Sequence, residues 1–223
     1  TAFIPPHDIA DRPTSGAEPA GLGRELALGL MERSKALLAG HPVNEARVAR
    51  GLPPATQIWL FWPGMRPGEM PSFAEAYGVS GALTSGVDLL RGLALQTGLT
   101  YLDIAGVTDE ADNDYAGQMA AALAALDHHD VVFVHVEAPD EASHAGDAEG
   151  KVRALENIDA LMVAQVIARR QAGDDLRILV MPDHPTPVAI KTHVAEPVPF
   201  VMWGAGVPAN GAQAFTEKEA RAT

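Results

Sequence analysis

Short apolar runs alternate with longer segments of helical periodicity along most of this chain. Apolar, β-branched and aromatic runs predict strands, because such side chains suit a pleated and buried surface. These runs cover residues 57–62, 79–84, 100–104, 131–136, 177–181 and 198–203. Apolar residues that recur every three or four positions predict helices. They cover residues 22–38, 87–96, 114–126 and 148–171, with shorter helices at 44–50, 72–78 and 215–220.

Strands that alternate with helices are typical of βαβ units. We therefore expect an α/β fold of three layers, α/β/α, with a mostly parallel central sheet. We expect the strands at 131–136 and 177–181 to be neighbours in that sheet. The chain has 223 residues, of which 47% are hydrophobic, which is enough for one sizeable domain and tight for two. It shows no internal repeat or linker-like tract, so residues 1–223 are interpreted as a single domain.

The charge and cysteine content narrow the range of functions. Lys and Arg total 16 against 29 Asp and Glu, so the formal net charge is −13. An acidic chain of this kind is a poor candidate for binding nucleic-acid backbones or anionic membrane surfaces, and no segment has the apolar length of a membrane span. The absence of cysteine excludes disulfides, thiolate metal sites and cysteine nucleophiles. It also fits a reducing compartment, and we expect a cytoplasmic protein.

The strand predicted at 131–136 runs directly into a carboxylate and an imidazole. Pro139 ends the apolar run because proline has no N–H to donate to a ladder, and Asp140 and His144 follow it. Four positions apart, the two side chains share a face if the segment is helical, and they can also converge in a loop. Ligands of open α/β sheets bind at such strand ends. Taken alone, the pair is equally compatible with a capping Asp and a solvated His.

A second pair, Asp183 and His184, follows the strand predicted at 177–181, with a proline on each side. A polar pair at the end of an apolar strand costs free energy unless it is solvated or liganded. In isolation, a turn with an Asx-type hydrogen bond would account for it. The other Asp/His pair and the nearby His193 favour a metal site instead, because carboxylate oxygen and imidazole nitrogen are common metal ligands.

His135 lies in the strand predicted at 131–136, and Glu137 directly follows that strand. The two residues are two positions apart, so they share one face of the strand. We interpret them as residues that support and orient the metal ligands rather than bind an ion directly. The alternative for His135 is a hydrogen-bonded core histidine.

These residues carry a family resemblance. The stretch VHVEAPDEASHAGD, followed by RALENIDALMV and ILVMPDHPTPVAIKTHVAEPVPFVMWG, resembles the C-terminal part of archaeal-type 2,3-bisphosphoglycerate-independent phosphoglycerate mutase, a family of the alkaline phosphatase superfamily. The likeness extends over HPVNEARVARGLPPATQIWLFWPG, FAEAYGVSGALTSGVDLLRGLA and DNDYAGQMAAAL, and so covers nearly the whole chain. The motifs Asp-Glu-Ala-Ser-His and Asp-His-Pro-Thr-Pro are specific to this family when they occur together.

The resemblance implies an alkaline phosphatase-like fold and two divalent metal ions. Manganese is the expected metal, with zinc, cobalt or magnesium as alternatives. Asp140, His144 and His193 match the ligands of one ion, and Asp183 and His184 match two ligands of the other. In the family, an Asp on the first strand and a nucleophilic Ser complete the second site. That Ser takes the phosphoryl group from 3-phosphoglycerate and returns it to the 2-position.

The chain also departs from the family pattern. The first strand, the Ser motif and most of the substrate-binding insertion have no counterpart, and no Ser here stands in a convincing nucleophile context. We therefore expect no catalytic nucleophile in this chain, and we interpret it as the C-terminal portion of a longer enzyme. Gln118 stands where the family pattern leads us to expect Lys.

Three functional hypotheses follow. The leading one is a portion of a phosphoglycerate mutase, an isomerase of glycolysis that acts on phosphoglycerate, with no nucleic-acid or membrane partner. The second keeps the metal site but changes the substrate, giving a metal-dependent phosphohydrolase or a phosphotransferase such as a homoserine kinase. The third, from another class, is a non-catalytic metal-binding scaffold. The sequence upstream in the parent gene would distinguish the enzymes from the scaffold.

Overall fold

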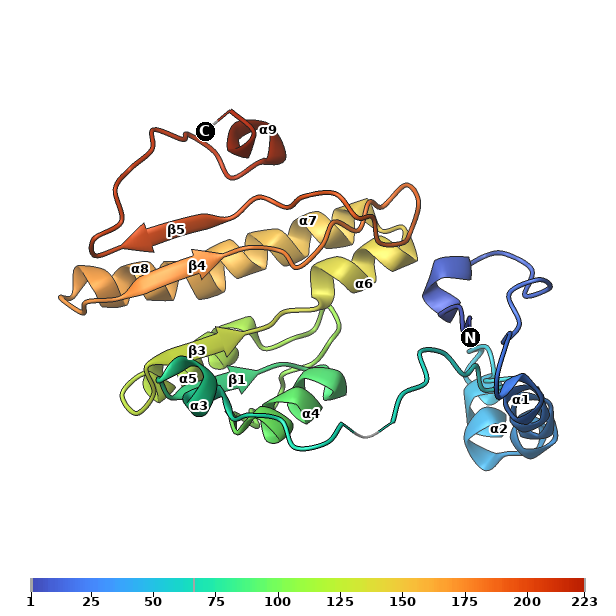
Figure 1. Cartoon of the computed structure of the whole chain (residues 1–223). Coiled ribbons are helices and arrows are strands. Elements are labelled where there is room, and N and C mark those ends of the chain that lie inside the picture. Colours follow the sequence, from blue (N-terminus) through green and yellow to red (C-terminus); the bar gives the residue numbers. More distant parts are fainter. Residues whose placement is uncertain (1, 66, 223) are drawn as a thin grey trace. The chain divides into compact units, whose positions relative to one another are not determined.

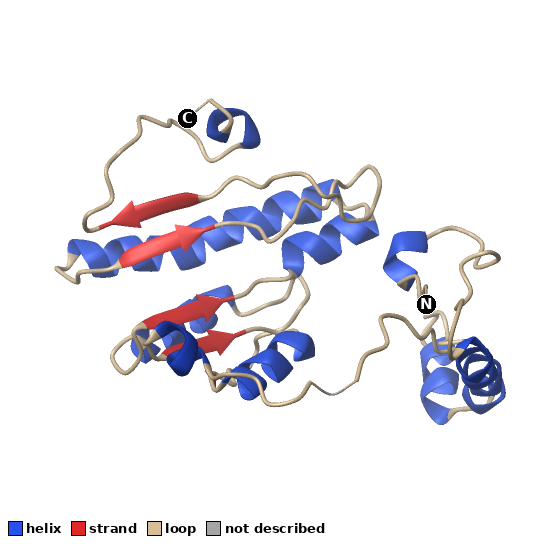
Figure 2. Cartoon of the chain, in the orientation of Figure 1, coloured by secondary structure: helices blue, strands red, loops and turns tan. Residues whose placement is uncertain are grey.

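The computed structural model describes residues 2–65 and 67–222. The chain divides into two compact units, Thr1–Arg66 and Pro67–Thr223, and each is described by itself (Figure 1). The single domain expected from the sequence stays a prediction. Helices dominate the first unit, and the second unit contains both helices and strands (Figure 2). In the described part of the chain, none of the helices combines the length and apolarity needed to cross a membrane.

The first unit contains the 3₁₀ helix η1 (Pro6–Ile9) and the helices α1 (Arg24–Ala39) and α2 (Pro42–Ala49). The predicted helix at 22–38 is confirmed as α1. Helix α2 begins earlier than its predicted start at Asn44, because the His41 ring caps it by accepting the Val43 N–H at 3.3 Å.

Asn44, where the predicted helix was to begin, lies inside α2 and is buried. Its side-chain amide donates to the carbonyls of Leu38 and Ala55 at 2.7 and 2.8 Å and accepts the Ala55 N–H at 2.8 Å. Asn44 therefore ties the end of α1 to the segment that follows α2, a tertiary role that its position in the sequence did not indicate.

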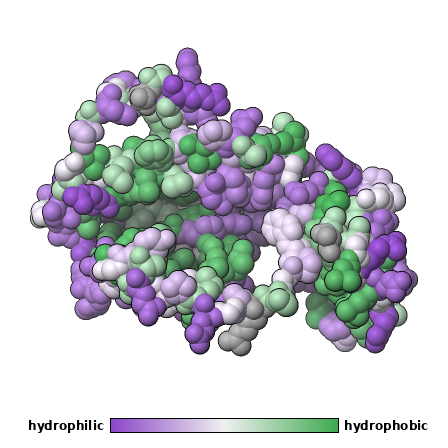
Figure 3. Space-filling view, viewed as in Figure 1, coloured by the Kyte–Doolittle hydropathy of each residue, from purple (hydrophilic) through white to green (hydrophobic). Residues whose placement is uncertain are grey.

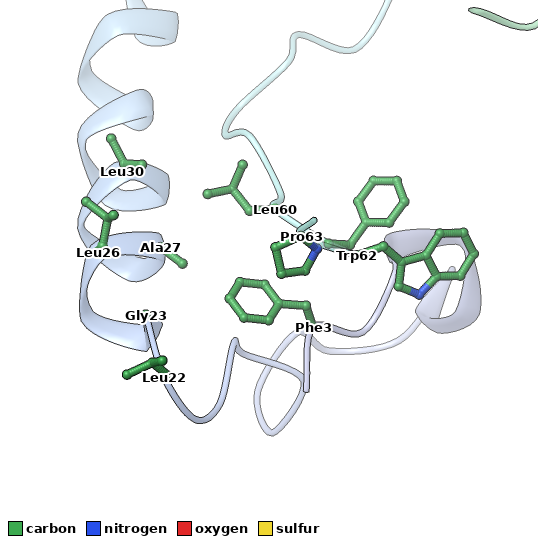
Figure 4. Close-up of a pocket in the computed structure, with 10 residues that line it drawn as sticks. Phe3, Leu22, Gly23, Leu26, Ala27, Leu30, Leu60, Trp62 and Pro63 are labelled. Atoms are coloured by element: carbon green, nitrogen blue, oxygen red, sulfur yellow. The ribbon is translucent and has the colours of Figure 1, made fainter. Parts of the chain in front are cut away.

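The strand predicted at residues 57–62 is wrong, because this segment is irregular. In the described part of the first unit the only β-bridge joins Ala2 and Ala20, so residues 57–62 have no neighbouring strand with which to pair. The apolar side chains of the segment instead line a recess together with residues of the N-terminal stretch and α1 (Figure 4). The segment is apolar because its side chains pack in this recess, not because it is a strand.

In the second unit, β1 (Gly81–Thr84), β2 (Thr100–Tyr101) and β3 (Val131–Val134) form a parallel sheet in the order β2-β1-β3. Ser80 sets the register at the start of β3, because its N–H and hydroxyl both donate to the Asp130 carboxylate at 2.8 and 2.7 Å. Helices α3 (Phe73–Tyr77) and α5 (Tyr115–Ala125) cover opposite faces of this sheet. The Phe133 ring meets Phe73 of α3, and the alternate valines of β3 pack on the other face against the core that includes α5.

The strands β4 (Arg177–Val180) and β5 (Val201–Gly204) form a separate, antiparallel pair. The expectation that residues 131–136 and 177–181 are neighbours in one sheet is therefore wrong, although both segments are strands where predicted. Apolar patterning predicts that a strand exists, but its partner is fixed only by the packing of the whole unit. The α/β class with a parallel sheet and covering helices is confirmed.

The helices of the second unit follow the predicted pattern closely. They are α3 (Phe73–Tyr77), α4 (Asp88–Thr97), α5 (Tyr115–Ala125), α6 (Ala138–Ala145), α7 (Ala148–Asn157), the π-helical segment η2 (Ile158–Val163), α8 (Ala164–Gln171) and α9 (Glu217–Ala220). Ser72 caps α3 in a reciprocal capping box with Glu75, and Gly98 ends α4 in the left-handed conformation.

One buried cluster joins these helices to both sheets. It consists of Tyr115, Met119, Ala122, Ala138, Ala154, Met162 and Val166. Alternate residues of β3, such as Val132 and Val134, pack against it from one sheet, and Ile178 of β4 packs against it from the other. The strands that precede the two Asp/His pairs therefore rest on the same helical layer.

Candidate metal centre

Helix α6 brings Asp140 and His144 together. It begins directly after β3, and because its residues are helical, side chains four positions apart lie on one face. The His144 Nε2 atom lies 3.1 Å from the Asp140 carboxylate, and the two side chains are only 14% and 21% exposed. Of the two local structures considered from the sequence, the helical turn is the one observed.

His193 reaches the same point from the loop that follows β4. Its Nε2 atom lies 3.0 Å from Nε2 of His144 and 3.6 Å from the carboxylate of Asp140. The Nδ1 atom of His144 lies 2.9 Å from the Lys191 carbonyl. Since a carbonyl oxygen can only accept, Nδ1 carries the proton in the neutral ring, and Nε2 directs a lone pair at the other two side chains.

The arrangement fits a divalent metal ion. Two imidazole nitrogens and the two carboxylate oxygens of Asp140 converge here with separations of 3.0–3.6 Å, and their lone pairs are stabilised by a shared cation or a shared proton. Ligands at about 2.0–2.2 Å from a tetrahedral ion stand roughly 3.3–3.6 Å from one another. The observed separations are of this size, and the donor set of one carboxylate and two imidazoles suits zinc, manganese or a related ion.

His184 and Asp183 lie beside this set. The His184 ring is 3.8 Å from the His193 ring, and Asp140, His184 and His193 each offer a ligand atom within 4.8 Å of the others. Thr186 donates its hydroxyl hydrogen to Asp140, so the His184 Nδ1 atom, 3.2 Å from the same hydroxyl, is the donor there. The His184 Nε2 lone pair then faces the Asp183 carboxylate at 3.2 Å, which gives a second pair of converging ligand atoms.

Thr186 is a site residue that sequence reasoning missed. It is 5% exposed, and its hydroxyl links the carboxylate of α6 to the imidazole of the loop after β4. The only signal was its place in the Asp-His-Pro-Thr-Pro motif.

His135 and Glu137 form a hydrogen-bonded chain behind the ligands. The Ser85 hydroxyl accepts the Val87 N–H at 3.0 Å and lies 3.0 Å from the Nδ1 atom of His135. Its hydrogen is thus donated to Nδ1, and Nε2 of the neutral ring donates to Glu137 at 3.2 Å. Burial lowers the pKa of His135, which favours this neutral form. Ser85, 2% exposed, was also missed, because a serine after an apolar strand has no distinctive pattern.

Negative charge is concentrated at the start of α6. Burial, followed by repulsion from Asp140 and Glu141, raises the pKa of Glu137 to about 7. Burial and the Asp140 charge also raise the pKa of Glu141. The three carboxylates offer ligand atoms within 4.8 Å of one another. Such crowding of like charge destabilises the ionised groups and is relieved by a bound cation.

Gln118 is fully buried and is hydrogen-bonded to His135, the residue that directly follows β3. Its amide donates to the His135 carbonyl at 3.0 Å and accepts from the Asn113 side chain at 2.9 Å. Ser143, in the middle of the ligand motif, is also buried, and its hydroxyl donates to the Pro139 carbonyl at 2.7 Å. Neither side chain is directed at the ligand cluster.

Comparison with known proteins agrees with this geometry. A family model described as the metalloenzyme superfamily matches residues 25–222. The chain belongs to the metalloenzyme superfamily. Membership implies that divalent metal is bound, and it confirms the family resemblance drawn from the sequence motifs at the level of the superfamily.

Among the relatives of this metalloenzyme-superfamily chain are mutases of archaea and bacteria. It is 46% identical to the 2,3-bisphosphoglycerate-independent phosphoglycerate mutase of Methanothrix thermoacetophila, over 96% of this chain and 54% of that protein. It is 42% identical to a probable enzyme of the same name from Geobacter sulfurreducens, over 98% of this chain and 55% of that protein. The chain thus spans about half the length of these curated relatives.

Two solved structures also match this chain over about half of their own length. A Pyrococcus horikoshii protein superimposes with a TM-score of 0.68 and 28% identity, over 89% of this chain and 51% of that one. The cofactor-independent phosphoglycerate mutase from Thermoplasma acidophilum gives a TM-score of 0.53 and 26% identity, over 94% of this chain and 49% of that one.

Proposed function

We propose that this chain is the metal-binding portion of a phosphoglycerate mutase that interconverts 3- and 2-phosphoglycerate, an isomerase of glycolysis in the cytoplasm. The observation that carries the proposal is the convergence of Asp140, His144 and His193, with separations of 3.0–3.6 Å, at the end of a parallel strand. The mutases that the chain resembles at 42–46% identity support the choice of reaction.

We further propose that two divalent ions are held here, manganese first, with zinc, cobalt or magnesium as alternatives. Asp140, His144 and His193 would hold one ion, and Asp183 and His184 would contribute to the other. Such ions neutralise the charge of a phosphoryl group and lower the pKa of a bound hydroxyl. The remaining ligands and the nucleophilic Ser are expected outside this chain.

The residues of this chain have distinct tasks in the proposed reaction. The Lys191 carbonyl fixes the tautomer and direction of His144, and Thr186 orients both Asp140 and His184. His135 and Glu137 would support the start of α6 from behind. The carboxylates there repel an anionic phosphoglycerate, so we expect substrate to bind only after cations have offset their charge.

The breadth of the superfamily match leaves a second candidate, a metal-dependent phosphohydrolase or phosphotransferase that uses the same ligands on another phosphate ester. The net charge of −13 argues against nucleic-acid and anionic-membrane partners in either case. The substrate in both candidates is a phosphorylated small molecule.

A chimera tests the proposal directly. This chain would replace the matched 54% of the Methanothrix thermoacetophila mutase, and conversion of 3-phosphoglycerate would be followed with Mn²⁺ present. We expect turnover in the chimera and its loss in the same chimera with His193→Ala. A folded, metal-loaded chimera that hydrolyses other phosphate esters but does not convert phosphoglycerate would favour the second candidate.

A further inference from the structure

The ligand loop, residues 181–200 between β4 and β5, carries three of the candidate metal ligands. Its anchoring therefore decides whether these ligands meet those of α6. Pro185, Thr186 and Pro187 stand in the middle of this loop. Because proline has no N–H, Thr186 has the only backbone donor of the three, and the segment is held mainly through its carbonyls.

The three carbonyls have different partners. Those of Pro185 and Pro187 accept N–H groups from within residues 190–194, which closes the loop on itself. The Thr186 carbonyl instead accepts a hydrogen bond at 2.9 Å from Nζ of Lys151, 35 positions earlier in the chain and on α7. A bond from an ammonium is charge-assisted and stronger than one between neutral groups. It joins the ligand loop to the helix that follows α6.

Lys151 is placed for this contact rather than for its own helix. It is the fourth residue of α7, where the helix dipole disfavours a positive charge. Arg153 on the same helix pairs with Asp147 and Glu149 at the helix start, whereas Lys151 reaches across to the ligand loop. The Asp147 side chain caps α7, so the side chain of Lys151 departs from a fixed point.

The contact lies in polar surroundings. In Figure 1 the ligand loop passes beside the start of α7, and Figure 3 shows mainly hydrophilic side chains on this face where the two meet. Directed hydrogen bonds therefore fix the loop here. Thr186 itself is 5% exposed, and its hydroxyl donates to Asp140 and lies 3.2 Å from Nδ1 of His184. The residue that Lys151 holds is thus the one that bridges two candidate ligands.

We propose that Lys151 is a positioning residue for the metal centre. By holding the Thr186 carbonyl, it keeps the Thr186 hydroxyl between Asp140 and His184, and so keeps the ligands of α6 and those of the ligand loop in register. The inference rests on the proposed metal site and adds to it a residue that acts through Thr186 without binding the ion.

The charge of Lys151 has an effect of the opposite sign. A positive charge near a cation site repels the cation, so removing the charge alone would tighten metal binding. Removing a positioning contact would weaken it. The direction of the change in metal affinity on Lys151→Met therefore separates the two roles, since Met is similar in length but has neither the charge nor the donor.

Calorimetric titration of this chain with Mn²⁺ measures that direction. We expect Lys151→Met to bind at least about tenfold more weakly than wild type, since loss of a supporting partner costs roughly 10–100-fold in affinity. Lys151→Arg keeps a charged donor and should bind nearly as wild type does. Arg153→Met is the matched control, because it removes a charge from the same helix, and it should bind at least as tightly as wild type.

The metal-free chain gives an independent readout. Long-range ¹H–¹⁵N NMR spectra at about pH 8, where an ordinary imidazole is neutral, show which ring nitrogen of His184 carries the proton. Wild type should show the Nδ1–H form, because Nδ1 donates to Thr186. Lys151→Met should lose this preference, and Arg153→Met should keep it.

A double-mutant cycle shows whether Lys151 acts through Thr186. Thr186→Val keeps the backbone carbonyl and the shape of the side chain but removes the hydroxyl. We expect Lys151→Met to weaken Mn²⁺ binding much less in the Thr186→Val background than in wild type, because the bridge that it positions is already absent.

Three results would overturn the inference. They are Mn²⁺ binding by Lys151→Met as tight as or tighter than that of wild type, an unchanged His184 tautomer in this variant, and additive effects in the cycle. If wild type binds no Mn²⁺, the proposed metal site fails, and the His184 tautomer alone decides the role of Lys151. If Lys151→Met does not fold, as its amide NMR spectrum would reveal, Lys151→Gln replaces it, because its side chain is uncharged and one bond shorter.

Discussion

Gln118→Glu replaces one amide nitrogen with an oxygen at a fully buried position, and the structure predicts a pH-dependent loss of stability. Gln118 donates to the His135 carbonyl at 3.0 Å and accepts from Asn113 at 2.9 Å. An ionised Glu keeps the second bond but places an oxygen against the His135 carbonyl. A protonated Glu can donate to that carbonyl and restores the pattern.

The magnitude follows from the pKa of the new carboxyl. Burial raises carboxyl pKa values by up to 3–5 units, and the bond from Asn113 opposes this, so we expect a rise of about 2–3 units. Each unit is worth about 1.4 kcal/mol, which gives a loss of about 3–4 kcal/mol when the group is ionised. Because the folded pKa lies above the unfolded one, the loss is absent below about pH 4.3 and grows as pH rises through the folded pKa.

Urea unfolding, followed through the amide NMR signals of the second unit at several pH values between 4.5 and 8, would measure this. Gln118→Met is the matched control, since it is similar in length but lacks both hydrogen-bonding groups. It should lose about 2–4 kcal/mol at every pH, because the Asn113 amide, the His135 carbonyl and the Thr84 hydroxyl each lose a partner. A Gln118→Glu deficit that does not vary with pH, or no deficit at pH 8, would refute the reasoning.

Three further predictions concern the core, the sheet and the activity. Met162→Ala, at a position 2% exposed in the buried cluster, should cost about 2–5 kcal/mol in urea unfolding; a cost below 1 kcal/mol would mean that the cluster repacks. The Ser80 hydroxyl and N–H lower the pKa of Asp130, so the stability it contributes is present above about pH 3.9 and lost as pH falls through the folded pKa. The Tm difference between wild type and Asp130→Asn should therefore shrink from pH 7 to pH 3, and a constant difference would contradict the role of the charge. The isolated chain should show no conversion of 3-phosphoglycerate and at most weak, chelator-sensitive phosphatase activity; robust mutase turnover free of host enzyme would reveal a nucleophile within it.

The sequence predicted local structure better than pairing. The helices predicted at 72–78 and 87–96 are present as α3 and α4, and their caps, Ser72 and Gly98, act through a few adjacent residues. The segment 57–62 has the composition of a strand, yet it has no partner strand and lines a recess instead. The separation of β3 from β4 was equally out of reach, because strand order depends on the packing of the whole unit.

In the metal site, too, the sequence predicted local relations but not contacts between distant residues. The spacing of Asp140 and His144 indicated a shared face, because helical geometry acts over four residues. Thr186 and Ser85 reach the cluster through contacts 46 and 50 positions apart, and the Lys191 carbonyl is a backbone group present at every residue. Such groups have no distinguishing type in a sequence and become visible only when the chain is folded.

Calorimetric titration with Mn²⁺ and with Zn²⁺ tests most directly whether Asp140, His144 and His193 form a cation site. Wild type, His144→Ala and His128→Ala would be compared, the last as a control because His128 is exposed and lies outside the cluster. We predict saturable binding by wild type and by His128→Ala. We predict for His144→Ala a loss larger than the roughly 10–100-fold that follows removal of a supporting partner. Equal binding by all three proteins would contradict the assignment of the site.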